Sequence, residues 1–124
     1  MNKLPKVTVH DIASELKALE QTTSSAYHSV EGNLDKANKA LEKGNFTHSI
    51  YVLDRAIELN PDNPRLITER AKVYIYAKMY QDALEQVDYL LYLKPDNEGA
   101  KQAKEVLQQK IRYTKLVTAH PLYS

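Results

Sequence analysis

The side chains that most often carry out catalysis or bind metal ions stand apart from one another in this sequence. The four histidines, at positions 10, 28, 48 and 120, share no spacing typical of metal ligands. The chain has no cysteine, which excludes disulfides, thiolate clusters and cysteine nucleophiles. Its three glycines are isolated, so no glycine-rich phosphate loop is present. The sequence therefore predicts a protein that is not an enzyme, with no cofactor and no metal site.

Length and charge narrow the class of protein further. The 124 residues are 43% apolar and 27% charged, which is ordinary composition for one globular domain. Lysine and arginine exceed acidic residues by one, and nucleic-acid binding needs a larger basic excess, so we expect no nucleic-acid partner. No run of residues is long and apolar enough to span a bilayer, and no secretory signal is visible. We therefore expect no membrane association and a cytoplasmic location, with the nucleus as the alternative.

A period of 34 residues runs through the middle of the chain. Residues 59–63, LNPDN, recur as residues 93–97, LKPDN, and the segments that lead into the two copies match in residue type. Phe46 corresponds to Tyr80, for example, and Leu53 to Val87. Such an internal period indicates a repeat of one supersecondary unit.

The pattern within each copy is helical. Apolar residues recur every three or four positions, which is typical of helices that bury one face. Pro61 and Pro95 cannot continue a helix. Gly44 is a favourable residue directly after a helix, and Asn45 is a favourable N-cap for the next one. Because the connectors are short, neighbouring helices should be antiparallel. The predicted helices lie near residues 31–43, 46–59, 64–78, 80–93 and 98–117.

These features resemble the tetratricopeptide repeat family. The matches are Ala37, Gly44, Phe46, Ala56 and Pro61 in the first copy, and Ala71, Tyr74, Tyr80, Ala83 and Pro95 in the second. The departures are Asn33 and Ser49, where the family favours large and small apolar residues, and Lys78, which replaces a glycine. The resemblance implies an all-α fold of antiparallel helical hairpins, stacked as a short right-handed solenoid with two full repeats over residues 30–97.

The segments on either side of the repeats have simpler patterns. Residues 98–117 should form a capping helix, because one face is apolar and the other is rich in lysine and glutamate. The apolar face, expected to pack on the second repeat, consists of Ala100, Ala103, Val106, Leu107 and Ile111. Residues 118–124 are expected to form a C-terminal tail.

Residues 1–29 should contain an amphipathic helix, because Ile12, Leu16 and Leu19 follow helical spacing. Two interpretations are open. Either a helix over 9–21 ends and Ser25 caps a second helix, or one helix runs from 9 to 43 with a seam that could pair with another copy. Two helices are the preferred interpretation.

The resemblance also implies a binding surface, since in the family the first helices of successive repeats line a concave groove that binds extended peptides or a partner's helix. Arg65 and Lys72 lie two turns apart, where they could together meet a carboxylate. The corresponding groove positions here are Leu34, Asn38, Leu41, Arg65, Thr68, Glu69, Lys72, Ile75, Tyr76 and Gln102. A possible second interface consists of Tyr89, Tyr92, Ile12, Leu16 and Leu19.

The expected function is a non-enzymatic protein–protein interaction module, acting as an adaptor or as a subunit of a multiprotein complex. One alternative is a co-chaperone-like receptor for the acidic C-terminal tail of a chaperone, since residues 36–46 look like the first helix of such proteins. At that subfamily's carboxylate clamp, however, only Asn38 agrees, and Glu69 would repel a carboxylate. The other alternative is a structural subunit or homodimer assembled through the N-terminal amphipathic helix.

Overall fold

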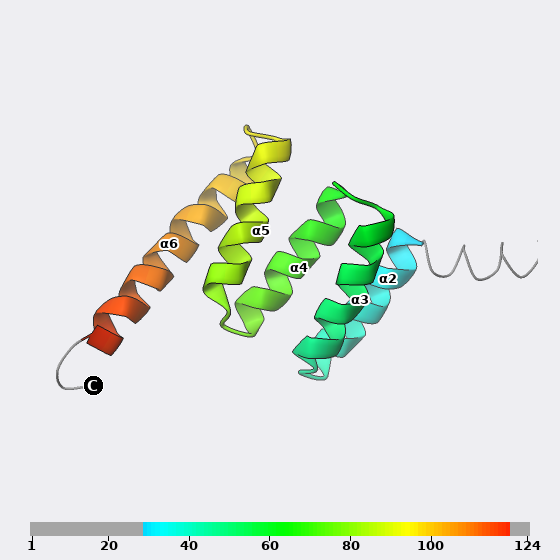
Figure 1. The fold of residues 1–124 in the computed structure, drawn as a ribbon, viewed down its shortest axis with the longest axis horizontal. Coiled ribbons are helices and arrows are strands. Elements are labelled where there is room, and N and C mark those ends of the chain that lie inside the picture. Colours follow the sequence, from blue (N-terminus) through cyan, green and yellow to red (C-terminus); the bar gives the residue numbers. More distant parts are fainter. Residues whose placement is uncertain (1–28, 120–124) are drawn as a thin grey trace, which may run out of the picture.

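The computed structural model describes residues 29–119, and every regular element among them is an α-helix. Figure 1 shows the helices stacked side by side, with consecutive helices antiparallel and joined by short connectors. Each helix packs on the next one in the chain, and α2 also contacts α4. The helices are α2 (Val30–Glu42), α3 (Phe46–Leu59), α4 (Pro64–Tyr76), α5 (Tyr80–Leu93) and α6 (Glu98–Ala119). The predicted all-α repeat is therefore confirmed.

The start of α2 decides between the two interpretations of the N-terminal region. Ser29 has extended backbone angles (φ −65°, ψ 116°), and its hydroxyl accepts a hydrogen bond from the amide of Gly32 at 3.0 Å. This is an N-cap, and it breaks the helical path, so a single helix from 9 to 43 is wrong. The cap of α2 is Ser29 and not Ser25. The predicted helix over 9–21, with Ile12, Leu16 and Leu19, lies outside the described residues.

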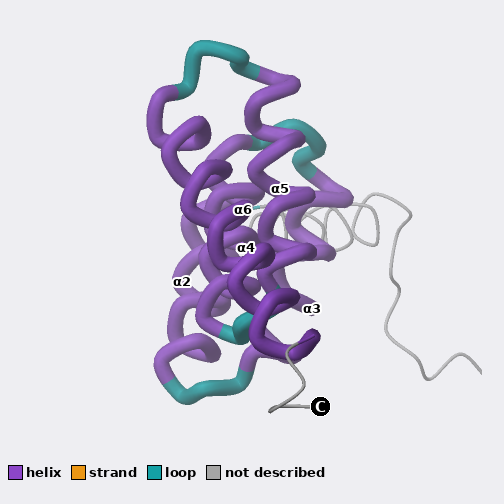
Figure 2. Tube along the Cα trace, turned by 90° about the vertical axis from the view of Figure 1, so that its left-hand side faces the viewer, coloured by secondary structure: helices purple, strands orange, loops and turns teal. Residues whose placement is uncertain are grey.

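At the other end, α6 is longer than predicted. It runs to Ala119 instead of ending at 117, because no proline or glycine interrupts the chain between Gly99 and Pro121. The first two residues of the predicted tail are therefore helical. Figure 2 shows how little of the described chain is left to the connectors.

Asparagine begins three of the helices. The side-chain oxygen of Asn45 accepts from the amide of His48 at 3.1 Å, and Asn63 and Asn97 cap α4 and α6 in the same way. Each asparagine satisfies amides that have no partner within the helix. These local bonds explain why the predicted helix starts agree closely with the structure.

The turn inside each repeat has one shape in spite of different sequences. Gly44 (φ 74°) and Lys78 (φ 61°) both take the left-handed conformation, and their amides donate at 2.9 Å to the carbonyls of Leu41 and Ile75. This bond is part of a Schellman helix end, in which glycine is favoured because it has no Cβ. Lys78 therefore holds a strained conformation that the neighbouring helices impose.

The core is divided into two clusters, and α4 belongs to both. Leu66 and Val73 of α4 are fully buried in the first cluster, while Ile67 and Ala71 of the same helix are buried in the second. The first cluster also contains Ala37, Val52, Leu53 and Ala56, and the second Ala83, Val87, Leu90, Ala100 and Leu107. A helix with two buried faces fixes how one repeat sits on the next.

Buried polar side chains of the first repeat have hydrogen-bond partners within that repeat. Ser49 is fully buried, and its hydroxyl donates to the carbonyl of Ala37 at 2.8 Å. The amide of Asn33 donates to the carbonyl of Ser29 at 2.9 Å. Because a buried polar group is costly only when it lacks a partner, these two departures from the tetratricopeptide pattern are compatible with the same packing.

One expectation for the capping helix is wrong. Ala100 and Leu107 are buried against the second repeat, but Val106 is 50% exposed. Val106 directly precedes the buried Leu107, and adjacent residues of a helix point about 100° apart, so Val106 lies beside the buried stripe and not on it. The helix therefore packs along a narrower stripe than its sequence predicts.

Replacing Lys78 with glycine should stabilise the protein. The substitution removes the strain of a left-handed non-glycine residue and adds some unfolded-state entropy, so we expect a gain of about 0.5–1 kcal/mol in the free energy of unfolding. Urea denaturation followed by circular dichroism measures this change. Gly44→Ala is the matched control and should destabilise. A Lys78→Gly protein less stable than the parent would contradict the assigned turn.

The small residues at the helix contacts should not tolerate enlargement. Ala56 and Ala71 are buried where helices touch closely. We expect Ala56→Leu or Ala71→Leu to destabilise the domain by roughly 1–3 kcal/mol, the usual cost of overpacking. Thermal melts of both variants test this, with Ala119→Leu on the exposed end of α6 as the control. Unchanged melting temperatures would show that these alanines lie away from the contacts.

Candidate binding groove

The surface between α2 and α4 contains an open hollow of about 600 Å³. Its walls come from helices that occupy equivalent places in the two repeats. The lining residues of this α2–α4 hollow are Glu31, Leu34, Asp35, Asn38, Pro64, Arg65, Thr68, Glu69 and Lys72. Six of the predicted groove residues are among them: Leu34, Asn38, Arg65, Thr68, Glu69 and Lys72.

The other four predicted groove residues lie elsewhere. Ile75 lines a smaller hollow of about 340 Å³ between α4, α5 and α6, which shares Thr68 and Lys72 with the first. Leu41 is half-buried against the core of the first repeat, so it serves packing. Tyr76, which is 63% exposed, and Gln102 lie outside both hollows.

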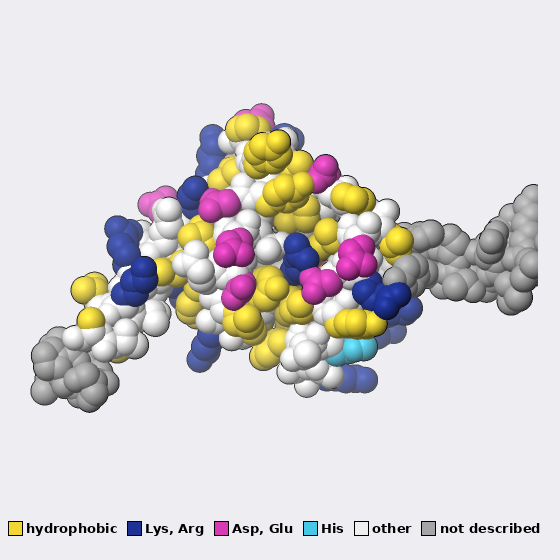
Figure 3. All heavy atoms as spheres, in the orientation of Figure 1, with side chains coloured by type: hydrophobic (Ala, Val, Ile, Leu, Met, Phe, Trp, Pro, Cys, Tyr) yellow, Lys and Arg dark blue, Asp and Glu magenta, His cyan; other side chains and the backbone are white. Residues whose placement is uncertain are grey.

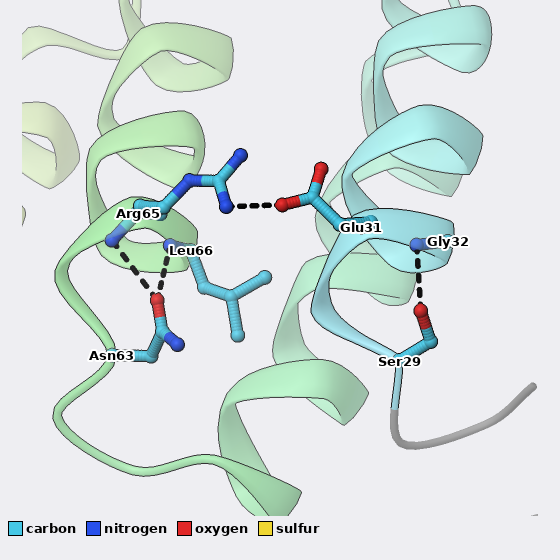
Figure 4. Close-up of polar contacts among 6 residues, drawn as sticks. All are labelled: Ser29, Glu31, Gly32, Asn63, Arg65 and Leu66. Atoms are coloured by element: carbon cyan, nitrogen blue, oxygen red, sulfur yellow. Dashed lines mark hydrogen bonds and ion pairs between the residues drawn. The ribbon is translucent and has the colours of Figure 1, made fainter. Parts of the chain in front are cut away.

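An ion pair closes one end of the α2–α4 hollow. In Figure 4 the Arg65 guanidinium and the Glu31 carboxylate reach toward each other from α4 and α2. Both are exposed, and the guanidinium donates a hydrogen bond to the carboxylate. This bond and the positive charge hold the pKa of Glu31 below its usual value. Above that lowered pKa the pair is intact, and it is lost as the pH falls through it.

A second ion pair lies deeper in the hollow. The ammonium of Lys72 is 2.9 Å from Oε1 of Glu69, whose side chain is only 15% exposed. This Oε1 is buried and accepts no well-aligned hydrogen bond within the described residues, so the Lys72 charge compensates it electrostatically. Both cations that were expected to meet a carboxylate of a ligand therefore already face one.

The net charge of the hollow follows from these pairs. Its lining has three carboxylates, from Glu31, Asp35 and Glu69, and two cations, from Arg65 and Lys72. The lining thus has one carboxylate more than it has cations, and Lys39, 3.0 Å from Asp35, balances it, so the hollow is no cationic clamp. Sequence reasoning omitted Asp35 from the groove, although its place one turn after Glu31 on the same helix face is a signal that could have found it.

The two tyrosines of the possible second interface lie together on α5. Their rings stack, with centroids 5.9 Å apart and an angle of 22° between planes. The hydroxyl of Tyr89 donates to the carboxylate of Asp62, and this hydrogen bond is the main cause that raises the pKa of Tyr89. Tyr92 is 78% exposed. Figure 3 shows hydrophobic side chains gathered over this end of α5.

The described residues were also compared with the requirements of a metal site and of a membrane span, and the sequence with known protein families. Within residues 29–119, no three histidine, aspartate or glutamate side chains come together as a metal ion would require. In the same part of the chain, each helix is too short or too polar to cross a membrane. No model of a known protein family matches the sequence. The likeness to tetratricopeptide repeats therefore rests on the positions of the residues themselves.

Removing the partner of Glu31 should change its acidity. We expect Arg65→Gln to raise the pKa of the Glu31 carboxyl toward its ordinary value, because the hydrogen bond and the charge that lower it are both lost. Carbon-detected NMR titration of the glutamate carboxyls measures this pKa directly. Arg112→Gln, on the distant helix α6, is the control. An unchanged pKa in Arg65→Gln would mean that the pair does not persist in solution.

Proposed function

We propose that this chain is a non-enzymatic protein–protein interaction module of the tetratricopeptide type, which binds an extended segment of a partner protein in the α2–α4 hollow. One observation carries the proposal. Six side chains selected by their position in the repeat line a single hollow between two helices that are one repeat apart. Positions unrelated to a shared groove would have scattered over the surface.

The chemistry of the hollow suits a peptide main chain. The Asn38 amide offers both a donor and an acceptor, and Thr68 adds a hydroxyl, while Leu34 provides apolar surface beside them. The ion pairs at Arg65 and Lys72 leave no unpaired cation in the lining. An acidic ligand would have to displace Glu31 or Glu69 from these pairs, which argues against the acidic chaperone tail.

The role of an adaptor or complex subunit follows from the same site. The lining supplies recognition without a nucleophile or a proton-transfer pair, so the chain would act by holding a partner. The absence of cysteine fits a reducing compartment such as the cytoplasm. Assembly through Ile12, Leu16 and Leu19, as a structural subunit or as a homodimer, is the competing proposal, and light scattering of the full chain tests its homodimer form.

Filling the hollow should abolish binding. A photo-crosslinking amino acid at position 38 captures the partner, and the captured segment is then made as a labelled peptide. We expect Thr68→Arg to weaken its affinity by at least about tenfold in fluorescence anisotropy, because the long side chain occupies the hollow and costs more than about 1.4 kcal/mol of binding.

The matched control is Thr47→Arg, at an exposed position on α3 outside the hollow, which should leave affinity within about twofold. If Thr68→Arg binds as tightly as the parent, the proposed site is wrong and the stacked tyrosines of α5 become the next surface to test.

A further inference from the structure

A second, larger hollow lies where α6 passes the turn between α4 and α5. Its volume is about 680 Å³. At this end α6 leans away from α5, as Figure 1 shows, and the lining of the hollow comes from α6, from the start of α5 and from the turn before it. The lining of this α6 hollow consists of Lys78, Tyr80, Val106, Gln109, Lys110, Tyr113 and Thr114. None of these side chains is acidic.

The charge of the α6 hollow is uncompensated. Lys78 and Lys110 form no ion pair with any residue in 29–119, whereas Lys72, Lys101 and Lys104 each have a carboxylate within 3.2 Å. The ammonium of Lys110 lies 5.6 Å from the centre of the Tyr80 ring. This cation–π contact positions the ammonium but leaves its charge in place. The hollow therefore presents two positive charges.

Apolar surface lies beside these two charges. Val106 is 50% exposed and Tyr113 is 69% exposed, and they occur seven residues apart on one face of α6. Tyrosine offers large contact area with few rotatable bonds, which favours its use in interfaces. A ligand that matches this hollow combines negative charge with an aromatic or large aliphatic side chain.

The residue at the turn between α4 and α5 also supports a ligand site in the α6 hollow. Lys78 takes a left-handed conformation where the equivalent position of the first repeat has Gly44. Glycine would relieve this strain, yet the chain has lysine here. The Lys78 side chain supplies one of the two unpaired charges of the α6 hollow. Strain that persists at such a position is expected when the side chain has a use.

We propose that the α6 hollow binds an acidic segment of a protein partner, with carboxylates facing Lys78 and Lys110 and an apolar side chain against Val106 and Tyr113. The site goes beyond the proposed function, since it differs in place from the α2–α4 hollow and its cations are unpaired, whereas those of the α2–α4 hollow face carboxylates. Nucleic acid fits less well, because two lysines on a chain of net charge +1 neutralise few phosphates.

Two short fluorescein-labelled peptides test the proposal with the full chain. One has glutamates around a central phenylalanine, and the other has glutamine in place of each glutamate. We expect the glutamate peptide to bind more tightly in anisotropy titrations, with an affinity that falls as salt rises. The double variant Lys78→Gly/Lys110→Gln should lose about tenfold of that affinity, since each exposed ion pair contributes modestly. Its fold is safe, because Lys78→Gly relieves strain.

The control is Lys36→Gln/Lys43→Gln, which removes the same charge from exposed positions on α2 and directly after it, outside both hollows, and should bind nearly as the parent. Thr68→Arg should also bind as the parent; loss of binding there would place the peptide in the α2–α4 hollow and overturn only this inference. Equal affinity for the two peptides, an equal loss in the control, or tighter binding of an oligouridylate would overturn it as well.

Discussion

The burial of α4 on two faces is the constraint on which the rest of the structure depends. Leu66 and Val73 belong to the core of the first repeat, and Ile67 and Ala71 to the core of the second. Sliding or turning α4 would open both clusters at once, and packed interiors tolerate little loss of contact. The position of α4 therefore fixes the α2–α4 hollow on one side. On the other side it fixes the smaller hollow that α4 forms with α5 and α6.

Polar contacts between neighbouring helices repeat with the same period as the core. Arg70 Nη1 lies 2.6 Å from Asp54, and 34 residues later Lys104 Nζ lies 2.8 Å from Asp88. Each pair joins the second helix of one repeat to the next helix in the chain. Arg70 also donates to Gln86 of α5 at 2.8 Å, so one guanidinium ties three helices together.

Ion pairs also explain why the α2–α4 hollow and the α6 hollow differ in charge. In the α2–α4 hollow Arg65 pairs with Glu31 of α2, and Lys72 pairs with Glu69 of its own helix. In contrast, α6 is the last helix of the described stack and has its neighbours on one side only. Lys110 faces the Tyr80 ring instead of a carboxylate. The α6 hollow therefore has two unpaired cations, whereas the cations of the α2–α4 hollow are paired.

Sequence alone determined the helices, their order and most of the α2–α4 hollow. These features follow from local caps such as Asn45 and Asn63, from the prolines, and from the 34-residue period, and all of them act over a few residues or recur visibly. Sequence did not select Ser29 over Ser25 as the cap of α2, because several neighbouring serines and threonines satisfy the same local rule.

Only the tertiary structure decided which charges are free. Arg65 was expected to face a ligand, yet it pairs with Glu31 of another helix, and Val106 was expected to be buried but is half exposed. The pair of Lys72 with Glu69 is different, because these residues lie three apart on α4 and the sequence already shows that spacing. The distance between side chains on different helices depends on how the helices cross and lean. That geometry is set by packing of the whole stack around α4, and no local pattern in the sequence records it.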